Sequence, residues 1–264
     1  MIGGVESMVL YLLAKRLRDK KSFQTERVVL GNVYIDPLLK ALLDGILFEM
    51  AGVELVLRAS RNSRVLAIER SMRELGVQVT FADNMELAEI IMETFGRMKE
   101  HGKPLPPRVF LFRNIDAFSP GEVLGTGRAF GLHIPLAGVD AINSPILFEH
   151  NLVGALGLEP PERAQQFVDS SPAGVIYHEL GHFYHNINGI DFRKGYDIFH
   201  GACWSKDNTP TKLHRKVTNT VSFYATSDSC GCEFVAEVFA GLALRKSFDD
   251  DIMDLYRSLN GPLV

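Results

Sequence analysis

The sequence is organised around the stretch from Val175 to His185, which reads VIYHELGHFYH. It contains His178-Glu179-x-x-His182, the pattern H-E-x-x-H that is typical of zinc sites on helices. Two imidazoles at positions i and i+4 of a helix lie close in direction and one turn apart, so both can meet one metal ion. Glu179 can then hold and deprotonate a water on the metal instead of binding the metal itself. The alternative is a pair of histidines that make only ordinary hydrogen bonds.

The residues around this motif predict a buried helix. Apolar side chains surround the two histidines, as expected for a helix in a core. Ser171 is a candidate N-cap, Pro172 suits the first helical position, and Gly189 is placed to end the helix. The sequence therefore predicts the motif on a helix that begins at Pro172.

A catalytic zinc ion normally has three protein ligands and an open position for water, so one more ligand is needed. An extension of the motif by G-x-x-H fails, because His185 stands where the glycine should be and Asn188 where the histidine should be. His185 also points away from His182 by helical geometry, which indicates a supporting or surface role for it.

Carboxylates on a second helix can supply the third ligand. Glu233 and Glu237 lie four residues apart, on one face of a helix predicted over Glu233 to Leu244. We expect Glu233 to bind the metal and Glu237 to accept the outer N–H of a metal-bound histidine. Glu237, Asp228 and Asp191 remain alternatives as the ligand, and a surface pair of acids is the simplest competing interpretation.

The pairing of H-E-x-x-H with Glu233-x-x-x-Glu237 resembles the gluzincin metallopeptidases. The stretches SFYATSD, from Ser222, and EFVAEVF, from Glu233, are more similar to lethal-factor-type toxins and related phage and bacterial-effector metallopeptidases. The resemblance covers about Pro172 to Arg245, and the gap between Tyr224 and Glu233 is longer than in that family. It implies zinc-dependent peptide-bond hydrolysis, with Tyr224 hydrogen-bonding the developing oxyanion or assisting the leaving amine.

The resemblance also implies a fold and a way of binding substrate. The fold is an α+β, zincin-like catalytic domain: a small mixed sheet, the active-site helix and C-terminal helices. The substrate is a protein or peptide whose backbone pairs with an exposed strand edge. The candidate edge is the short strand at residues 131–135, with Gly131, Leu132 and His133 as substrate-binding residues, although a lone histidine on a strand is usually structural.

The pattern of predicted elements suggests two domains. Strand–helix–strand alternation indicates an N-terminal α/β subdomain at residues 1–83, a scaffold or a substrate-positioning unit. It has no glycine-rich nucleotide loop, so no cofactor is assigned to it. Residues 84–264 form the predicted metallopeptidase domain. Its elements are helices at residues 84–100, 162–168, 212–222, 233–244 and 249–259, strands at residues 108–113, 131–135 and 146–148, and an irregular region from Gly189 to Pro210.

Composition and the placement of apolar and basic residues limit which partners and which cellular location we expect for the protein. The 264 residues carry a net charge of −4, so there is no basic surplus to collect nucleic-acid phosphates. No apolar run approaches the ~20 residues of a membrane helix. Basic residues follow the apolar run at residues 8–13 and do not precede it, unlike in a signal peptide. We expect synthesis in the cytoplasm, with export as an effector only by a route that needs no cleaved signal.

Three cysteines fit a reducing compartment. A second, structural zinc site at His200, Cys203, Cys230 and Cys232 is conceivable, but its spacing is unusual. Free thiols, or a disulfide from Cys203 to one of the pair, are the alternatives. The leading functional hypothesis is a zinc endopeptidase. A catalytically silent zincin-fold binding module and a peptidase acting on cell-wall peptides are the competing hypotheses.

Overall fold

The computed structural model describes residues 54–55, 60–113, 130–133, 135, 138–157, 166–189, 191–227 and 230–264. The helices and strands predicted between residues 5 and 50 lie outside these ranges. So does most of the helix predicted at residues 162–168.

The sheet is small and mixed. Its four strands are β1 (Glu54–Leu55), β2 (Val109–Arg113), β4 (Ile146–Glu149) and β3 (Gly131–His133), in the order β1-β2-β4-β3. The β2–β4 pair is parallel, whereas β1 pairs with β2 and β3 with β4 in antiparallel fashion. β4 is buried along its whole length, as expected for a central strand without alternating polarity. Among the described strands, this order places β3 at an edge of the sheet, as the sequence predicted.

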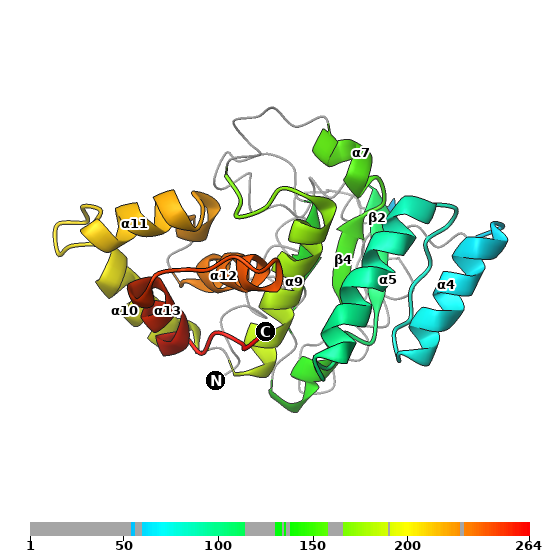
Figure 1. The fold of residues 1–264 in the computed structure, drawn as a ribbon. Coiled ribbons are helices and arrows are strands. Elements are labelled where there is room, and N and C mark those ends of the chain that lie inside the picture. Colours follow the sequence, from blue (N-terminus) through cyan, green and yellow to red (C-terminus); the bar gives the residue numbers. More distant parts are fainter. Residues whose placement is uncertain are drawn as a thin grey trace, which may run out of the picture.

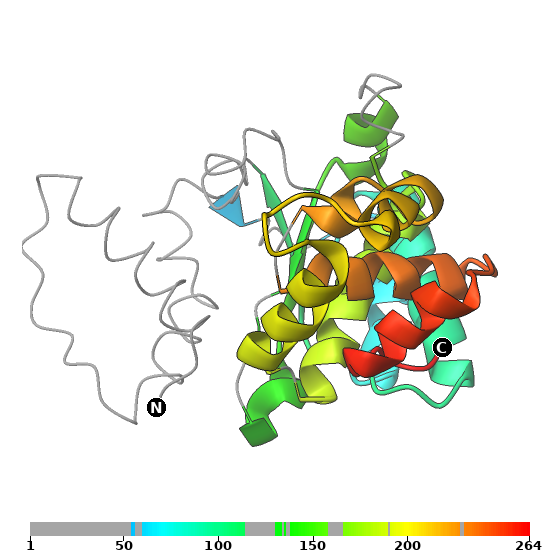
Figure 2. The ribbon, with the colours of Figure 1, turned by 90° about the vertical axis from the view of Figure 1, so that its left-hand side faces the viewer.

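Helices make up most of the described chain, and Figure 2 shows them gathered on one side of the strands. The chain is thus mixed α and β, which agrees with the predicted α+β class. Figure 1 labels the larger elements. The helices are α4 (Ser63–Glu74), α5 (Met85–Glu100), α7 (Leu152–Gly157), α9 (Pro172–Ile187), α10 (Phe192–Cys203), α11 (Lys212–Thr220), α12 (Cys232–Ala243) and α13 (Asp250–Ser258), with 3-10 turns η2 (Gly138–Asn143) and η3 (Tyr224–Thr226).

Local capping chemistry fixes where two helices begin. The Ser171 side chain accepts a hydrogen bond from the Gly174 N–H at 3.0 Å, and Pro172 occupies the first turn of α9. Asn84 begins α5 in the same way, accepting from the Leu87 N–H at 3.0 Å. Both predicted helix starts are confirmed.

The predicted irregular region from Gly189 to Pro210 is wrong over most of its length, because α10 occupies Phe192–Cys203. Asp191 caps this helix by accepting from the Lys194 N–H at 3.0 Å. Gly195 lies inside α10, where an added Cβ would be 2.8 Å from the Cys230 carbonyl oxygen. The glycine therefore allows α10 to pack closely against the backbone at Cys230. The neighbouring sequence gives no sign of this contact.

The described residues before position 84 share the sheet and core with those after it. β1 pairs with β2, and α4 packs against α5. The domain boundary at residue 83 itself stays a prediction. None of the helices in the described part of the chain combines the length and apolar character that a bilayer crossing requires.

Candidate metal centre

Two helices from distant parts of the sequence, α9 and α12, pack closely against one another and carry the site (Figure 1). Gly181 lies at their contact, where an added Cβ would be 2.9 Å from the Ala236 Cα and 3.1 Å from the Ala236 carbonyl oxygen. The missing side chain lets the two backbones approach, and this brings the first turn of α12 opposite the histidines of α9. No local signal in the sequence identifies Gly181 as this contact point.

Three metal-binding atoms converge between the helices. The Nε2 atoms of His178 and His182 lie 3.0 Å apart, and the Oε2 atom of Glu233 lies 3.1 Å and 3.2 Å from them. A tetrahedral zinc ion with bonds of about 2.0 Å would separate its ligands by about 3.3 Å, so the spacing fits such an ion. Within the described residues, this is the group of His, Cys, Asp and Glu side chains that could hold a metal ion.

A buried carboxylate orients one of these histidines. The Nδ1 atom of His178 donates to Oε1 of Glu237 at 2.7 Å, and Oε2 of Glu237 accepts from the backbone N–H of Val168. Because Nδ1 carries the proton in this hydrogen bond, the lone pair of Nε2 can face the cluster. Glu237 thus lies on the outer side of His178, where the sequence predicted it, and Glu233 faces the inner side.

The electrostatics of the cluster favour a positive charge. Burial would lower the pKa of His178, but hydrogen bonds to Glu233 and Glu237 outweigh burial and hold the pKa well above its usual value. Burial likewise opposes the raised pKa of His182, which the charge of Glu233 produces. Burial would raise the pKa of Glu233, yet His182 and His178 keep it far below its usual range. The two carboxylates thus favour positive charge between them, which protonated histidines supply. If the histidines are neutral, a bound cation can supply that positive charge instead.

Glu179 lies beside the histidine pair and is 6 % exposed. Burial raises the pKa of Glu179, and the nearby His178 and His182 offset part of that rise. A carboxylate whose pKa is raised is a stronger base than an ordinary carboxylate, which suits it to take a proton from a water at a metal site. The structure therefore brings together the predicted base and the three predicted ligands.

Tyr224 belongs to η3 and lies at the rim of the cluster. Its ring centroid is 5.7 Å from that of His178 and 4.9 Å from that of Phe167. Its backbone N–H donates to the Gln166 carbonyl oxygen at 2.9 Å, which ties η3 to the segment before α9. The side chain is half-buried, so the phenol is near the site without being enclosed in the core.

The predicted substrate strand runs along the active-site helix, since β3 contacts α9. The His133 ring is buried against Phe183, with centroids 6.1 Å apart, and burial lowers the pKa of His133 well below its usual value. Any role of His133 toward a substrate would therefore use its backbone. The Leu132 side chain lies outside the described residues.

Other candidate ligands have different partners. His185 is 4 % exposed and donates from Nε2 to the Leu259 carbonyl oxygen at 2.8 Å, so it anchors the C-terminal region and a surface position is excluded. Asp191 caps α10, and Asp228 lies outside the described residues.

The possible structural zinc site does not form. His200 stacks on Tyr196 with ring centroids 4.8 Å apart, and Cys203 is buried in the core. Among the described residues, these two do not join Cys230 and Cys232 in a group that could hold a metal ion. The Sγ atoms of Cys230 and Cys232 contact one another at 2.6 Å.

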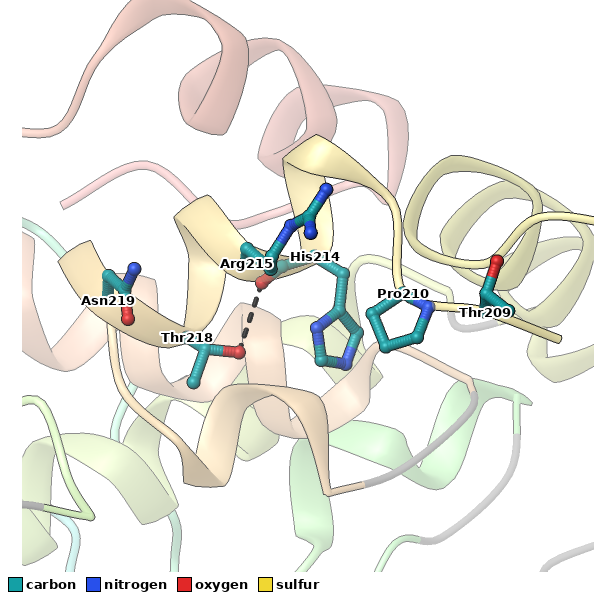
Figure 3. A pocket seen from close by; sticks show the side chains of 6 residues that line it. All are labelled: Thr209, Pro210, His214, Arg215, Thr218 and Asn219. Atoms are coloured by element: carbon teal, nitrogen blue, oxygen red, sulfur yellow. Dashed lines mark hydrogen bonds between the residues drawn. The ribbon is translucent and has the colours of Figure 1, made fainter.

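A separate open hollow lies along α11 (Figure 3). Its lining residues are Thr209, Pro210, His214, Arg215, Thr218 and Asn219. Several of these groups already have partners inside the protein. Thr218 donates its hydroxyl to the His214 carbonyl oxygen at 3.0 Å, and the His214 ring packs against Trp204 with centroids 4.6 Å apart. The hollow contains no residue of the metal cluster.

The assignment of this centre rests on the residues of this chain alone. The ligand atoms converge, Glu237 fixes one ring, and Glu179 and Tyr224 flank the cluster. No protein-family model, no curated protein and no solved structure matches the chain.

Proposed function

We propose that the protein is a zinc-dependent endopeptidase with a zincin-like fold. The observation that carries the proposal is the convergence of His178 Nε2, His182 Nε2 and Glu233 Oε2, with buried Glu179 beside them. Two neutral imidazoles and one carboxylate, with a glutamate base next to them, form a donor set that suits catalytic zinc. The mixed sheet with β3 at its edge along α9 supports the zincin-like part of the proposal.

Each residue has a distinct role in the proposed reaction. Zinc held by His178, His182 and Glu233 would supply Lewis acidity and lower the pKa of a water toward 7. Glu179 takes a proton from the water as it attacks the peptide carbonyl, and passes the proton to the leaving nitrogen. Tyr224 donates a hydrogen bond to the carbonyl oxygen as negative charge develops there. The backbone edge of β3 aligns the substrate chain.

Metal analysis and peptide cleavage together test this proposal. The purified protein should bind zinc in a one-to-one ratio, and His182→Ala should lose that zinc. The wild type should cleave members of a broad peptide library, whereas Glu179→Gln should retain zinc and lose cleavage. New N-termini in a lysate treated with wild type, and absent with Glu179→Gln, would then identify the substrate class.

The outcomes separate the competing functions. Zinc binding without cleavage of any peptide would contradict the endopeptidase and favour a binding module. Cleavage of purified peptidoglycan peptides, with no cleavage of proteins, would indicate that the substrate is a cell-wall peptide. Full activity of Glu179→Gln would overturn the mechanism.

A further inference from the structure

The edge strand β3 meets the proposed base through its backbone. A Cβ added at Gly131 would lie 2.6 Å from Cγ, 2.7 Å from Oε1 and 2.9 Å from Cδ of Glu179. Carbon atoms in optimal contact are about 3.5–4.0 Å apart, so even a methyl group at position 131 would overlap the Glu179 side chain. The backbone of Gly131 is outside the left-handed region, so conformational freedom does not explain the glycine.

The pairing register fixes which backbone groups of β3 face β4. The Phe130 carbonyl accepts from the Glu149 N–H at 2.9 Å, so the polar groups of residue 130 face β4. In an antiparallel ladder these directions alternate along the strand, so the backbone groups of Gly131 and His133 face away from β4. The backbone N–H of His133 opposes the rise in the pKa of Glu179 that burial produces.

We propose that Gly131 is a positioning residue for Glu179, an inference that rests on the proposed function. The absent side chain leaves room for the Glu179 side chain over the backbone of β3. The base is thereby confined from two directions: α9 carries its backbone, and β3 limits where its side chain can lie. Any residue other than glycine at position 131 would displace the carboxylate from the histidine pair while leaving the three metal ligands in place.

Gly131→Ala tests the kinetic consequence. Because a displacement of about 1 Å can cost about 100-fold in rate, we expect kcat to fall by about that factor. The KM for a peptide and the affinity for zinc should stay close to wild type, since no ligand atom is moved. Gly96→Ala is the matched control, because a Cβ at Gly96 in α5 meets nothing within 4 Å.

A stability cycle on the metal-free protein tests the contact without any assay of activity. Gly131→Ala should lower Tm in the wild-type background through the overlap with Glu179. In a Glu179→Ala background the overlapping atoms are absent, so the same substitution should lower Tm much less, and the double variant should regain stability relative to Gly131→Ala.

Two results would overturn the inference: equal losses of Tm in both backgrounds, or a Gly131→Ala enzyme with wild-type kcat. Failure of the wild type to cleave any peptide would instead overturn the proposed function. The stability cycle would still decide whether Gly131 sets the position of Glu179.

Discussion

His178 and Glu237 form a buried hydrogen-bonded pair, with Nδ1 donating to Oε1 at 2.7 Å. The second oxygen of Glu237 accepts from the backbone N–H of Val168, so both oxygens have fixed partners. Glu237 is 1 % exposed, and water cannot replace either contact. The carboxylate therefore holds the ring with Nε2 facing Glu233 and His182.

Glu237→Gln should lower zinc affinity by about 10- to 100-fold, the usual effect of removing an outer partner of a metal-bound histidine. An amide NH₂ cannot accept a hydrogen bond, so either His178 or Val168 loses its acceptor. Competition with a chromophoric chelator measures the affinity. Glu93→Gln, an exposed glutamate on α5, is the control. Unchanged affinity in Glu237→Gln would show that the pair does not orient the ligand.

Tyr224→Phe should lower kcat by about 100-fold, the typical cost of losing one oxyanion donor. The phenyl ring keeps the packing with His178 and Phe167, so zinc affinity should not change. Steady-state kinetics on a cleaved peptide, with parallel metal analysis, provide the measurement. Tyr196→Phe removes a hydroxyl from a residue that is 44 % exposed on α10 and should leave kcat unchanged. Equal kcat for wild type and Tyr224→Phe would assign the tyrosine a packing role only.

Local chemistry accounts for what the sequence predicted well. Ser171 and Pro172 predicted the start of α9, and the i, i+4 spacing of His178 and His182 predicted their common face. Glu233 could be named because a catalytic zinc site needs a third ligand and a carboxylate pair follows on another helix. These inferences depend on residues near in sequence or on the chemistry of a complete ligand set.

Close approaches of distant segments to glycines explain what could not be predicted. Gly195 lies in the region predicted to be irregular, but in the fold it belongs to α10 and accommodates the Cys230 carbonyl. Gly181 and Gly131 likewise allow close approaches, to Ala236 and to Glu179. A glycine in the sequence does not indicate which residue will pack against it. That residue is determined only when distant segments of the chain come together in the fold. The same holds for the Val168 N–H, which any residue except proline could supply.

His185 should make the metal-free protein less stable as the pH falls below 6.5. Burial lowers the pKa of His185 to about 4, against an ordinary value of 6.5. Between these values the unfolded chain binds the additional proton, so stability rises with pH across that window. The contribution is about 3.5 kcal/mol at most, from about 1.4 kcal/mol per pKa unit.

Urea unfolding of the metal-free protein at pH 7 and pH 4.5 measures this dependence. His185→Gln can still donate to the Leu259 carbonyl but does not titrate, so its stability should change less between the two pH values. Some dependence should remain, because burial lowers the pKa of His133 in the same direction. Identical pH dependence in wild type and His185→Gln would contradict the assignment.

Cys203 should resist thiol reagents in the folded protein. Its side chain is fully buried at the end of α10, and burial raises the pKa of the thiol to about 12. The reactive thiolate is therefore scarce at pH 8, and the sulfur is also inaccessible. Labelling with a maleimide, followed by peptide mass spectrometry, should modify Cys203 only after urea unfolding, and the unfolded sample is the control for intrinsic reactivity. Rapid labelling of Cys203 in the native protein would mean that the contact between α10 and the core opens readily.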